Sequence, residues 1–177
     1  MRYFKKLILY AILSVAISGC AIYHHYGEYS GKIVDAETKQ PLEGAVVLVK
    51  YYTWTWGSPG GQSSHYLDAQ EAVADKKGEF KISSLNAFAF RPLATFEPEP
   101  GFTIFKPRYE CYTRPMAADS RVTIELRQLK TVKERIANLS CTPVNVPNNR
   151  MMQFLKIQDI ERIELGFKPG FLKEEPK

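Results

Sequence analysis

Apolar residues between positions 30 and 126 alternate with polar ones in short runs, which is the two-residue period of half-buried β-strands. Residues that favour turns, chiefly glycine, proline and aspartate, separate these runs. The predicted strands are Ser30–Val34, Ala45–Tyr52, Gln70–Asp75, Glu79–Ser83, Phe102–Tyr112 and Arg121–Leu126. Ala45–Tyr52 is apolar on both faces in its middle, as expected for a central strand. Together the runs predict a small antiparallel sandwich.

Two local signals refine this prediction. Lys76-Lys77-Gly78 lies between two of the runs and predicts a hairpin turn, with Gly78 at the position that needs a positive φ. In the last run Val122, Ile124 and Leu126 alternate with polar residues, so these three side chains are expected to point inward.

After Arg127 the period of the apolar residues becomes helical. Thr131 and Glu134 form a capping-box pattern, and Val132, Ile136 and Leu139 follow at the spacing of one helix face, which we expect to pack on the sandwich. A second helix is predicted over Asn149–Leu165. Its apolar residues surround the helix axis, which favours packing on the core or on a partner over lying on a membrane surface.

The first twenty residues have the pattern of an export signal. A positively charged start precedes the apolar run 7–17, which is too short to cross a bilayer unaided, and Ile17-Ser18-Gly19-Cys20 follows. This segment resembles the signal of bacterial lipoproteins. The resemblance implies cleavage after Gly19 and diacylation of the Cys20 sulfur. An ordinary secretory signal cut after Gly19 and a retained anchor helix are the alternatives.

Removal of residues 1–19 would lower the formal charge of the chain from +5 to +2, because the segment holds three lysine and arginine residues and no acidic ones. The remaining chain has no basic patch interleaved with aromatics, so nucleic acid is not an expected partner. Because Ala21 rather than aspartate follows Cys20, the resemblance to lipoproteins implies the outer membrane, on its periplasmic face. The membrane, reached through the lipid on Cys20, is the first expected partner.

Several segments of the sandwich region also resemble the carboxypeptidase regulatory-like domain. They are Gly31-Lys32-Ile33-Val34-Asp35, Pro41-Leu42-Glu43-Gly44-Ala45-Val46-Val47, Asp75-Lys76-Lys77-Gly78-Glu79-Phe80 and Val122-Thr123-Ile124-Glu125-Leu126. The resemblance covers residues 29–127. It implies a mainly β fold, a transthyretin-like Greek-key β-sandwich of about seven strands, here with one or two C-terminal α-helices. It does not imply peptidase activity.

The expected organisation has four parts. They are a signal peptide over 1–19, a lipid-anchored linker over 20–28, the sandwich over 29–127 and a helical extension over 128–177. His24 and His25 in the linker are adjacent, so in an extended chain they point to opposite sides and are not predicted to bind a metal. No cofactor is expected.

With Cys20 assigned to the lipid, Cys111 and Cys141 remain as a pair in an oxidising compartment. A disulfide between them is the hypothesis, and two unrelated buried thiols are the alternative. The spacing alone does not decide between them.

The candidate ligand site is aromatic. Tyr52, Trp54 and Trp56 fall on one face if the strand continues, either as a platform for a sugar or a partner or as a cover for the sheet. No convergent set of nucleophile, base and orienting acid stands out, so no catalytic residue is predicted. The sequence favours a non-enzymatic, lipid-anchored binding or scaffolding protein of the cell envelope. The alternative is a carbohydrate- or peptide-binding lipoprotein that uses Trp54 and Trp56, and an accessory subunit of an enzyme ranks below both.

Overall fold

The computed structural model describes residues 20–58, 61–92, 94–116 and 121–171, together with residues 3, 6 and 10. The side chains of residues 20–22, 56–58, 92 and 121 are not described. The expected signal peptide therefore falls almost wholly outside the described residues, as do the side chains of Cys20 and Trp56. Among the helices of the described residues, none is long and apolar enough to cross a membrane.

The described chain is mainly β, with two α-helices at its C-terminal end. The strands are β1 (Cys20–Tyr26), β2 (Tyr29–Asp35), β3 (Val46–Ser58), β4 (Gly61–Val73), β5 (Glu79–Ile82), β6 (Leu85–Pro92), β7 (Ala94–Phe96), β8 (Gly101–Phe105), β9 (Tyr112–Pro115) and β10 (Arg121–Leu126). The helices are α2 (Val132–Asn138) and α3 (Met152–Glu164), with the short 3₁₀ turns η1 (Leu139–Cys141) and η2 (Asn148–Arg150).

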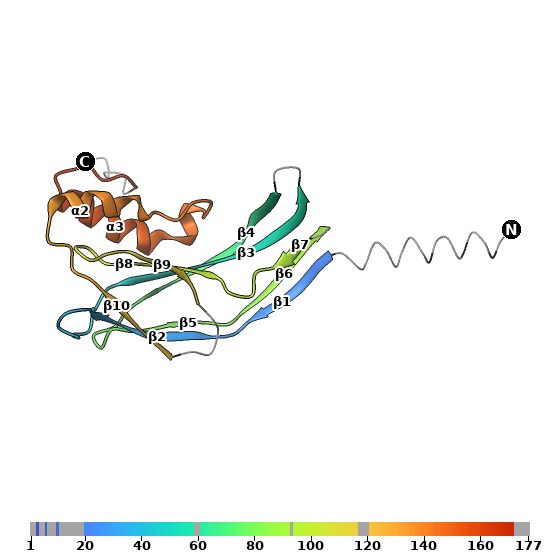
Figure 1. Ribbon diagram of the computed structural model, residues 1–177, viewed down its shortest axis with the longest axis horizontal. Helices are drawn as coiled ribbons and strands as arrows, with labels where there is room; N and C mark the ends of the chain where they lie inside the picture. The colour runs from blue at the N-terminus through green and yellow to red at the C-terminus, as the bar shows by residue number, and fades with distance from the viewer. Residues whose placement is uncertain are drawn as a thin grey trace, which may run out of the picture.

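Two sheets form a sandwich, which confirms the predicted fold class. The expectation that the sandwich is antiparallel throughout is wrong, because β10 runs parallel to β2. One sheet has the order β10-β2-β5, and the other has the order β4-β3-β8-β9 with β7 paired to the far part of β3. Figure 1 shows the two sheets as stacked layers, with α2 and α3 as a third layer above the larger sheet. The apolar core lies between the sheets. It includes the fully buried side chains of Ile33, Val47, Val49, Phe102 and Ile104, and each such side chain stabilises the fold by about 1.5–3 kcal/mol.

The segment expected to be a linker is a strand over most of its length, so that expectation is wrong for residues 20–26. β1 begins at Cys20 and pairs with β6 in an antiparallel ribbon, in which Cys20 lies opposite Pro92 and Tyr26 opposite Leu85. The ribbon extends beyond the sandwich on the same side as the long β3–β4 hairpin (Figure 1). Because the paired residues of β1 and β6 lie 59 to 72 residues apart in the chain, no local pattern could indicate the pairing.

The turn at residues 75–79 forms, but the hairpin does not. Gly78 has a φ of +74°, as predicted, and its N–H donates to the Asp75 carbonyl at 2.8 Å. The strands on either side then separate, because β4 pairs with β3 and β5 pairs with β2. The turn is therefore a corner between the two sheets.

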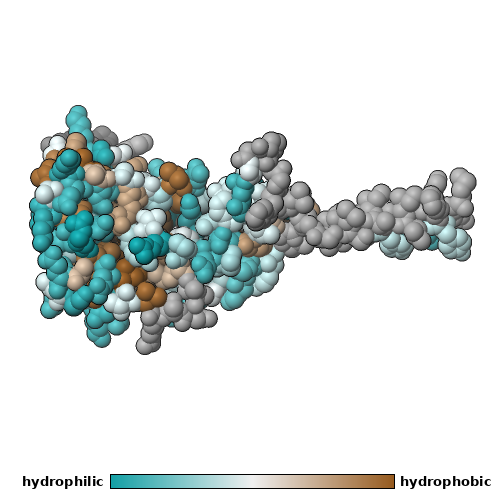
Figure 2. All heavy atoms as spheres, viewed as in Figure 1, coloured by the Kyte–Doolittle hydropathy of each residue, from teal (hydrophilic) through white to brown (hydrophobic). Residues whose placement is uncertain are grey.

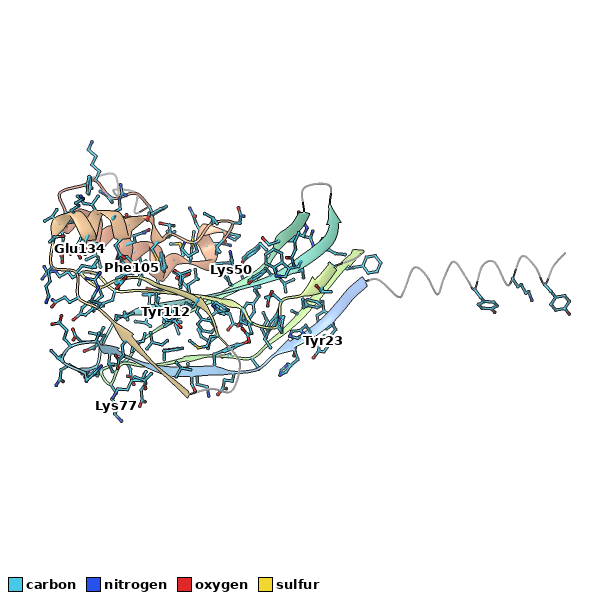
Figure 3. All side chains as sticks on the ribbon, viewed as in Figure 1. Tyr23, Lys50, Lys77, Phe105, Tyr112 and Glu134 are labelled. Carbon is cyan, nitrogen blue, oxygen red and sulfur yellow. A yellow bond between two sulfur atoms is a disulfide. The ribbon has the colours of Figure 1, made fainter. Side chains whose placement is uncertain are left out.

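The two helices differ in how they are held. α3 packs on the larger sheet through buried Phe154 and Leu155, and the Phe154 ring lies 5.6 Å from that of Phe105 on β8. Figure 3 places Phe105 directly beneath the helical layer. These contacts confirm α3 as a core-packing helix.

α2 has the predicted capping box of Thr131 and Glu134 but no buried residue, so the expectation that its apolar face packs on the sandwich is wrong. Val132 and Ile136 are exposed. Polar contacts hold the helix instead, since Arg135 donates two hydrogen bonds to the fully buried Glu161 of α3, at 2.7 and 2.8 Å. Figure 2 shows the surface of the helical layer, where exposed apolar residues lie among hydrophilic ones.

Candidate functional site

The outer face of β3 is covered along one half and open along the other. Residues 46, 48, 50, 52 and 54 share this face because successive side chains of a strand point to opposite sides. Val46 and Leu48 are buried under α3, in a cluster that includes Phe154 and Leu155. Lys50, Tyr52 and Trp54 continue the same row past the end of this cover, and they are only partly buried.

A groove of about 500 Å³ lies over this open half of the sheet. Its floor is made by Lys50, Tyr52 and Trp54 of β3 together with β8 around Thr103, and β9 contributes the segment 113–115. Residues 140–144, which lead from α2 toward α3, form the opposite wall. In Figure 3 Lys50 lies between the helical layer and the projecting β3–β4 hairpin, at this opening.

Two features hold the wall in place. The structure joins Cys141 in the wall to Cys111, just before β9, through a disulfide with the Cα atoms 6.4 Å apart, a separation ordinary for a disulfide. The buried amide of Gln158 on α3 donates to the Leu139 carbonyl at 2.9 Å and accepts from the Thr142 hydroxyl at 2.9 Å. The wall is thus fastened to both the sheet and the helix.

The aromatic floor is ordered by contacts of its own. The rings of Tyr52 and Trp54 meet edge to face, with centroids 5.3 Å apart. The indole N–H of Trp54 donates to the Glu97 carboxylate at 2.5 Å, and the Lys50 ammonium lies 5.7 Å from the centre of the Tyr52 ring. These contacts orient the two rings before any ligand binds, which lowers the entropy cost of binding.

The described lining of the groove carries positive charge, and the carboxylates of Glu97 and Glu99 lie close to its two aromatic rings. Lys50 and Arg114 are among its described lining residues, which include no carboxylate. Burial raises the pKa of the Tyr52 hydroxyl, and the charges of Glu97 and Glu99 raise it further. That hydroxyl therefore stays protonated at neutral pH and can donate a hydrogen bond.

The structure places Tyr52 and Trp54 on one face, as the alternation of the strand predicts. Trp56 lies in β3, two residues after Trp54, but its side chain is not among those that the structure describes. Arg114 and Thr142 belong to the groove although nothing in the sequence singled them out. They reach it through the pairing of β9 with β8 and through the path of the wall, both of which are long-range features.

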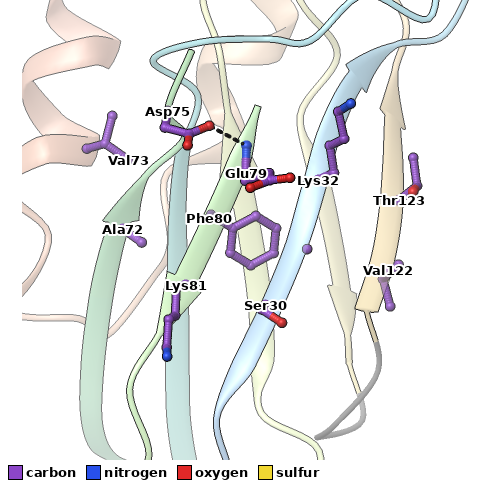
Figure 4. A pocket seen from close by; sticks show the side chains of 11 residues that line it. Ser30, Lys32, Ala72, Val73, Asp75, Glu79, Phe80, Lys81, Val122 and Thr123 are labelled. Carbon is purple, nitrogen blue, oxygen red and sulfur yellow. Dashed lines mark hydrogen bonds between the residues drawn. The ribbon is translucent and has the colours of Figure 1, made fainter. Parts of the chain in front are cut away.

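A second hollow, of about 640 Å³, lies beside the β5 edge of the sandwich (Figure 4). Its lining holds two cations and two carboxylates, Lys32, Lys81, Asp75 and Glu79, and the Phe80 ring occupies its centre. Phe80 is almost fully buried and belongs to the core. This hollow therefore offers neither an exposed ring nor a net charge to a ligand.

His24, His25 and Asp68 have structural partners. His24 packs against Tyr26 and Phe96, and the His25 ring is hydrogen-bonded to Asn86 at 2.7 Å. Asp68 pairs with Arg150 at 2.9 Å. No group of three or more histidine, cysteine or acidic residues in the described part of the chain could hold a metal ion.

No protein-family model matches the chain, and no curated protein matches it. Among solved structures it is similar to the C-terminal domain of the shaft pilin SpaA from Lactobacillus rhamnosus GG, with 20% identity over 59% of this chain and 98% of that domain, at a TM-score of 0.35. Against the whole shaft pilin the identity is 21% and the TM-score 0.33, with 61% of this chain and 47% of the pilin covered. A 9R-lipoxygenase from Cyanothece PCC8801 is similar at 14% identity over 72% of this chain and 23% of the lipoxygenase, at a TM-score of 0.28. Similarities this low imply no shared function.

Proposed function

We propose that the protein is a lipid-anchored, non-enzymatic component of the bacterial cell envelope that binds an acidic carbohydrate. The observation that supports binding is the groove beside Tyr52 and Trp54, which combines ordered aromatic rings with the cations Lys50 and Arg114. Aromatic faces stack on the C–H faces of sugars, while lysine and arginine pair with carboxylate or phosphate groups. Hydroxyl groups of Thr113 and Thr142 line the same groove.

The lipid anchor is proposed from the sequence. Ile17-Ser18-Gly19-Cys20 supplies the cleavage and acylation pattern, and Ala21 favours outer-membrane sorting with the protein on the periplasmic face. Mass analysis of protein purified from membranes tests the anchor, since cleavage before Cys20 and the added mass of acyl chains are expected. An unmodified chain with its N-terminal methionine would contradict it.

Binding is tested on an array of acidic and neutral oligosaccharides. We expect retention of acidic glycans, and a loss of about tenfold in affinity for Trp54→Ala, which removes one stacked ring. Phe167→Ala serves as the matched control, because Phe167 is an exposed aromatic on the loop after α3, away from the groove.

A charge substitution separates recognition of acidic groups from stacking. Lys50→Gln is expected to weaken the binding of acidic glycans more than that of neutral ones, because it removes the ion pair as well as the contact of the ammonium with the Tyr52 ring. Absence of glycan retention by the folded wild-type protein, together with a stable protein partner in a pull-down from solubilised envelope, would favour scaffolding instead.

A further inference from the structure

The projecting β1–β6 ribbon displays three exposed aromatic side chains. Tyr23 is 53% exposed, Phe88 is 70% exposed and Phe90 is 80% exposed. Tyr23 and Phe88 lie opposite each other in the ribbon, with ring centroids 5.0 Å apart. We call these three exposed residues, two of them paired across the ribbon and Phe90 nearer its Cys20 end, the aromatic face of the ribbon. Contiguous exposed rings on a small protein mark a surface that contacts something apolar.

The other face of the ribbon accounts for its structural role. Ala87 is buried there, and Tyr26 packs on Tyr51 of β3 with ring centroids 4.6 Å apart. Because strand residues alternate, Phe88 points away from these contacts. The register of the ribbon shifts between the Tyr23–Phe88 and Ala21–Arg91 pairs, so Phe90 is assigned by its exposure rather than by alternation. Figure 3 shows Tyr23 on the side of the ribbon that faces away from β3 and β4. The aromatic face is therefore not required to hold the ribbon to the sandwich.

The register of the ribbon places this face next to Cys20. Cys20 lies opposite Pro92, two residues beyond Phe90 on β6. At a rise of about 3.3 Å per residue, Phe90 stands about 7 Å along the ribbon from the level of Cys20, and Phe88 about 13 Å. The headgroup region on each side of a bilayer is about 5–8 Å deep. If the ribbon is perpendicular to the membrane, Phe90 still lies within reach of the headgroup layer. If the ribbon is tilted toward the membrane, all three rings reach it.

We propose that the aromatic face of the ribbon rests in the headgroup region of the bilayer that holds the lipid on Cys20. The inference rests on the proposed lipid anchor. Phenylalanine and tyrosine rings favour the membrane interface, and the exposed Arg91 beside Phe90 can pair with lipid phosphate groups. Because β1 begins at Cys20, no unpaired spacer separates the lipid from the fold. The sandwich is then held in a fixed orientation rather than swinging on a tether.

The experiment uses the full-length lipidated protein, reconstituted into vesicles of phosphatidylethanolamine and phosphatidylglycerol. Phe90→Cys introduces a thiol for an environment-sensitive fluorophore, since Cys20 is acylated and Cys111 is bonded to Cys141. Lys77→Cys is the control, because Lys77 is an exposed residue at the opposite end of the molecule (Figure 3). Quenching by lipid-attached quenchers in the headgroup and upper acyl region is measured for both labels.

We expect quenching at position 90 to exceed that at position 77 by about twofold or more, because only position 90 lies within the interfacial layer. Phe88→Cys provides a second position should the first variant fold poorly, and it is expected to give an intermediate value. Equal quenching at both ends, with the protein still floating with the vesicles, would overturn this inference and leave the lipid anchor intact. Failure to float, with Cys20 unmodified by mass, would overturn the anchor and with it the inference.

Discussion

The carboxylate of Glu71 accepts a hydrogen bond from the backbone N–H of Phe154 at 2.7 Å, although Glu71 lies on β4 and Phe154 in the first turn of α3, 83 residues later. It also accepts from the N–H of Gln153 at 3.0 Å. The residue at the N-cap position is Met151, whose side chain makes no capping hydrogen bond. A sheet side chain thus satisfies the free N–H groups of this helix, and its negative charge favours the helix N-terminus.

Replacement of this cap should weaken the docking of α3 on the sheet. We expect Glu71→Ala to lower the free energy of unfolding by about 1–2 kcal/mol, as loss of a helix cap does. Glu71→Gln keeps one acceptor oxygen and should cost less. Urea unfolding measures both, with Glu99→Ala as the control, because Glu99 is an exposed carboxylate on a loop. A loss for Glu99→Ala equal to that for Glu71→Ala would contradict the assignment.

The parts of the fold that depend on neighbouring residues could be predicted from the sequence. The capping box of Thr131 and Glu134, the positive φ of Gly78 and the inward side of β10 each depend on a few consecutive positions. The same alternation placed Tyr52 and Trp54 on one face. Each of these features depends on backbone geometry within one turn or one strand.

Apart from the hypothesis that pairs Cys111 with Cys141, long-range partners could not be predicted from the sequence. Nothing near Met151 indicates that Glu71 caps its helix, and nothing near Cys20 indicates that β6 lies beside it. The polar contact of Arg135 with Glu161 likewise explains why α2 leaves Val132 exposed, against the helical pattern of its apolar residues. Such contacts depend on the tertiary structure, in which residues far apart in sequence become neighbours.

Loss of the disulfide should destabilise the protein and loosen the groove. The bond between Cys111 and Cys141 closes a sequence separation of 30 residues, so the double variant Cys111→Ser, Cys141→Ser should lose about 3.5 kcal/mol of unfolding free energy by the loop-closure relation. Glycan retention should fall as well, because Cys141 lies in the groove wall. Mass analysis of the oxidised wild-type protein after alkylation without reduction is the direct check, and two alkylated thiols would refute the bond.

The close approach of Phe80 to Gly31 makes any side chain at Gly31 costly. A Cβ added there would lie 2.7 Å from the Val122 carbonyl oxygen and 2.8 Å from the Phe80 ring. Because the carbonyl belongs to the backbone of β10, it cannot move aside without disturbing the pairing with β2. We expect Gly31→Ala to lower the unfolding free energy by about 2–3 kcal/mol, at the upper end for overpacking.

Gly101→Ala is the matched control for that substitution, because Gly101 also lies in a strand but a Cβ there would meet nothing closer than 3.9 Å. The unfolding free energy of the Gly101→Ala variant should stay within about 0.5 kcal/mol of that of the wild type. Thermal and urea unfolding measure the loss of unfolding free energy for Gly31→Ala and for Gly101→Ala. Similar stabilities of the two variants would show that the β10-β2-β5 sheet accommodates a methyl group at Gly31.

Asp35 should make the stability of the sandwich depend on acid pH. At the end of β2 its carboxylate accepts hydrogen bonds from the N–H groups of Thr38 at 2.7 Å and Glu37 at 2.8 Å, and from the Tyr109 hydroxyl at 3.1 Å. These donors, led by the Thr38 N–H, hold the pKa of Asp35 below its usual value. The ionised form is therefore favoured by folding.

The sign of the effect follows from that lowered pKa. The stabilisation is complete above the usual pKa of aspartate, about 3.9, and is lost as the pH falls through that value and then through the lower pKa of the folded state. Asp35→Asn cannot ionise, so it should be less stable than wild type at pH near 7 and should lose less on acidification. The difference in unfolding free energy between wild type and Asp35→Asn should therefore shrink between about pH 5 and pH 3.

Comparing the two proteins at each pH removes the contributions of other carboxylates, among them Glu134 and Glu164, whose pKa values are also lowered by their hydrogen-bond partners. Tyr109→Phe removes one donor and leaves the carboxylate, so its pH dependence should fall between those of wild type and Asp35→Asn. Urea unfolding across this range of pH measures all three proteins. A difference between wild type and Asp35→Asn that stays constant with pH would show that these hydrogen bonds do not favour the ionised form, and the turn after β2 would then owe its stability to its backbone geometry alone.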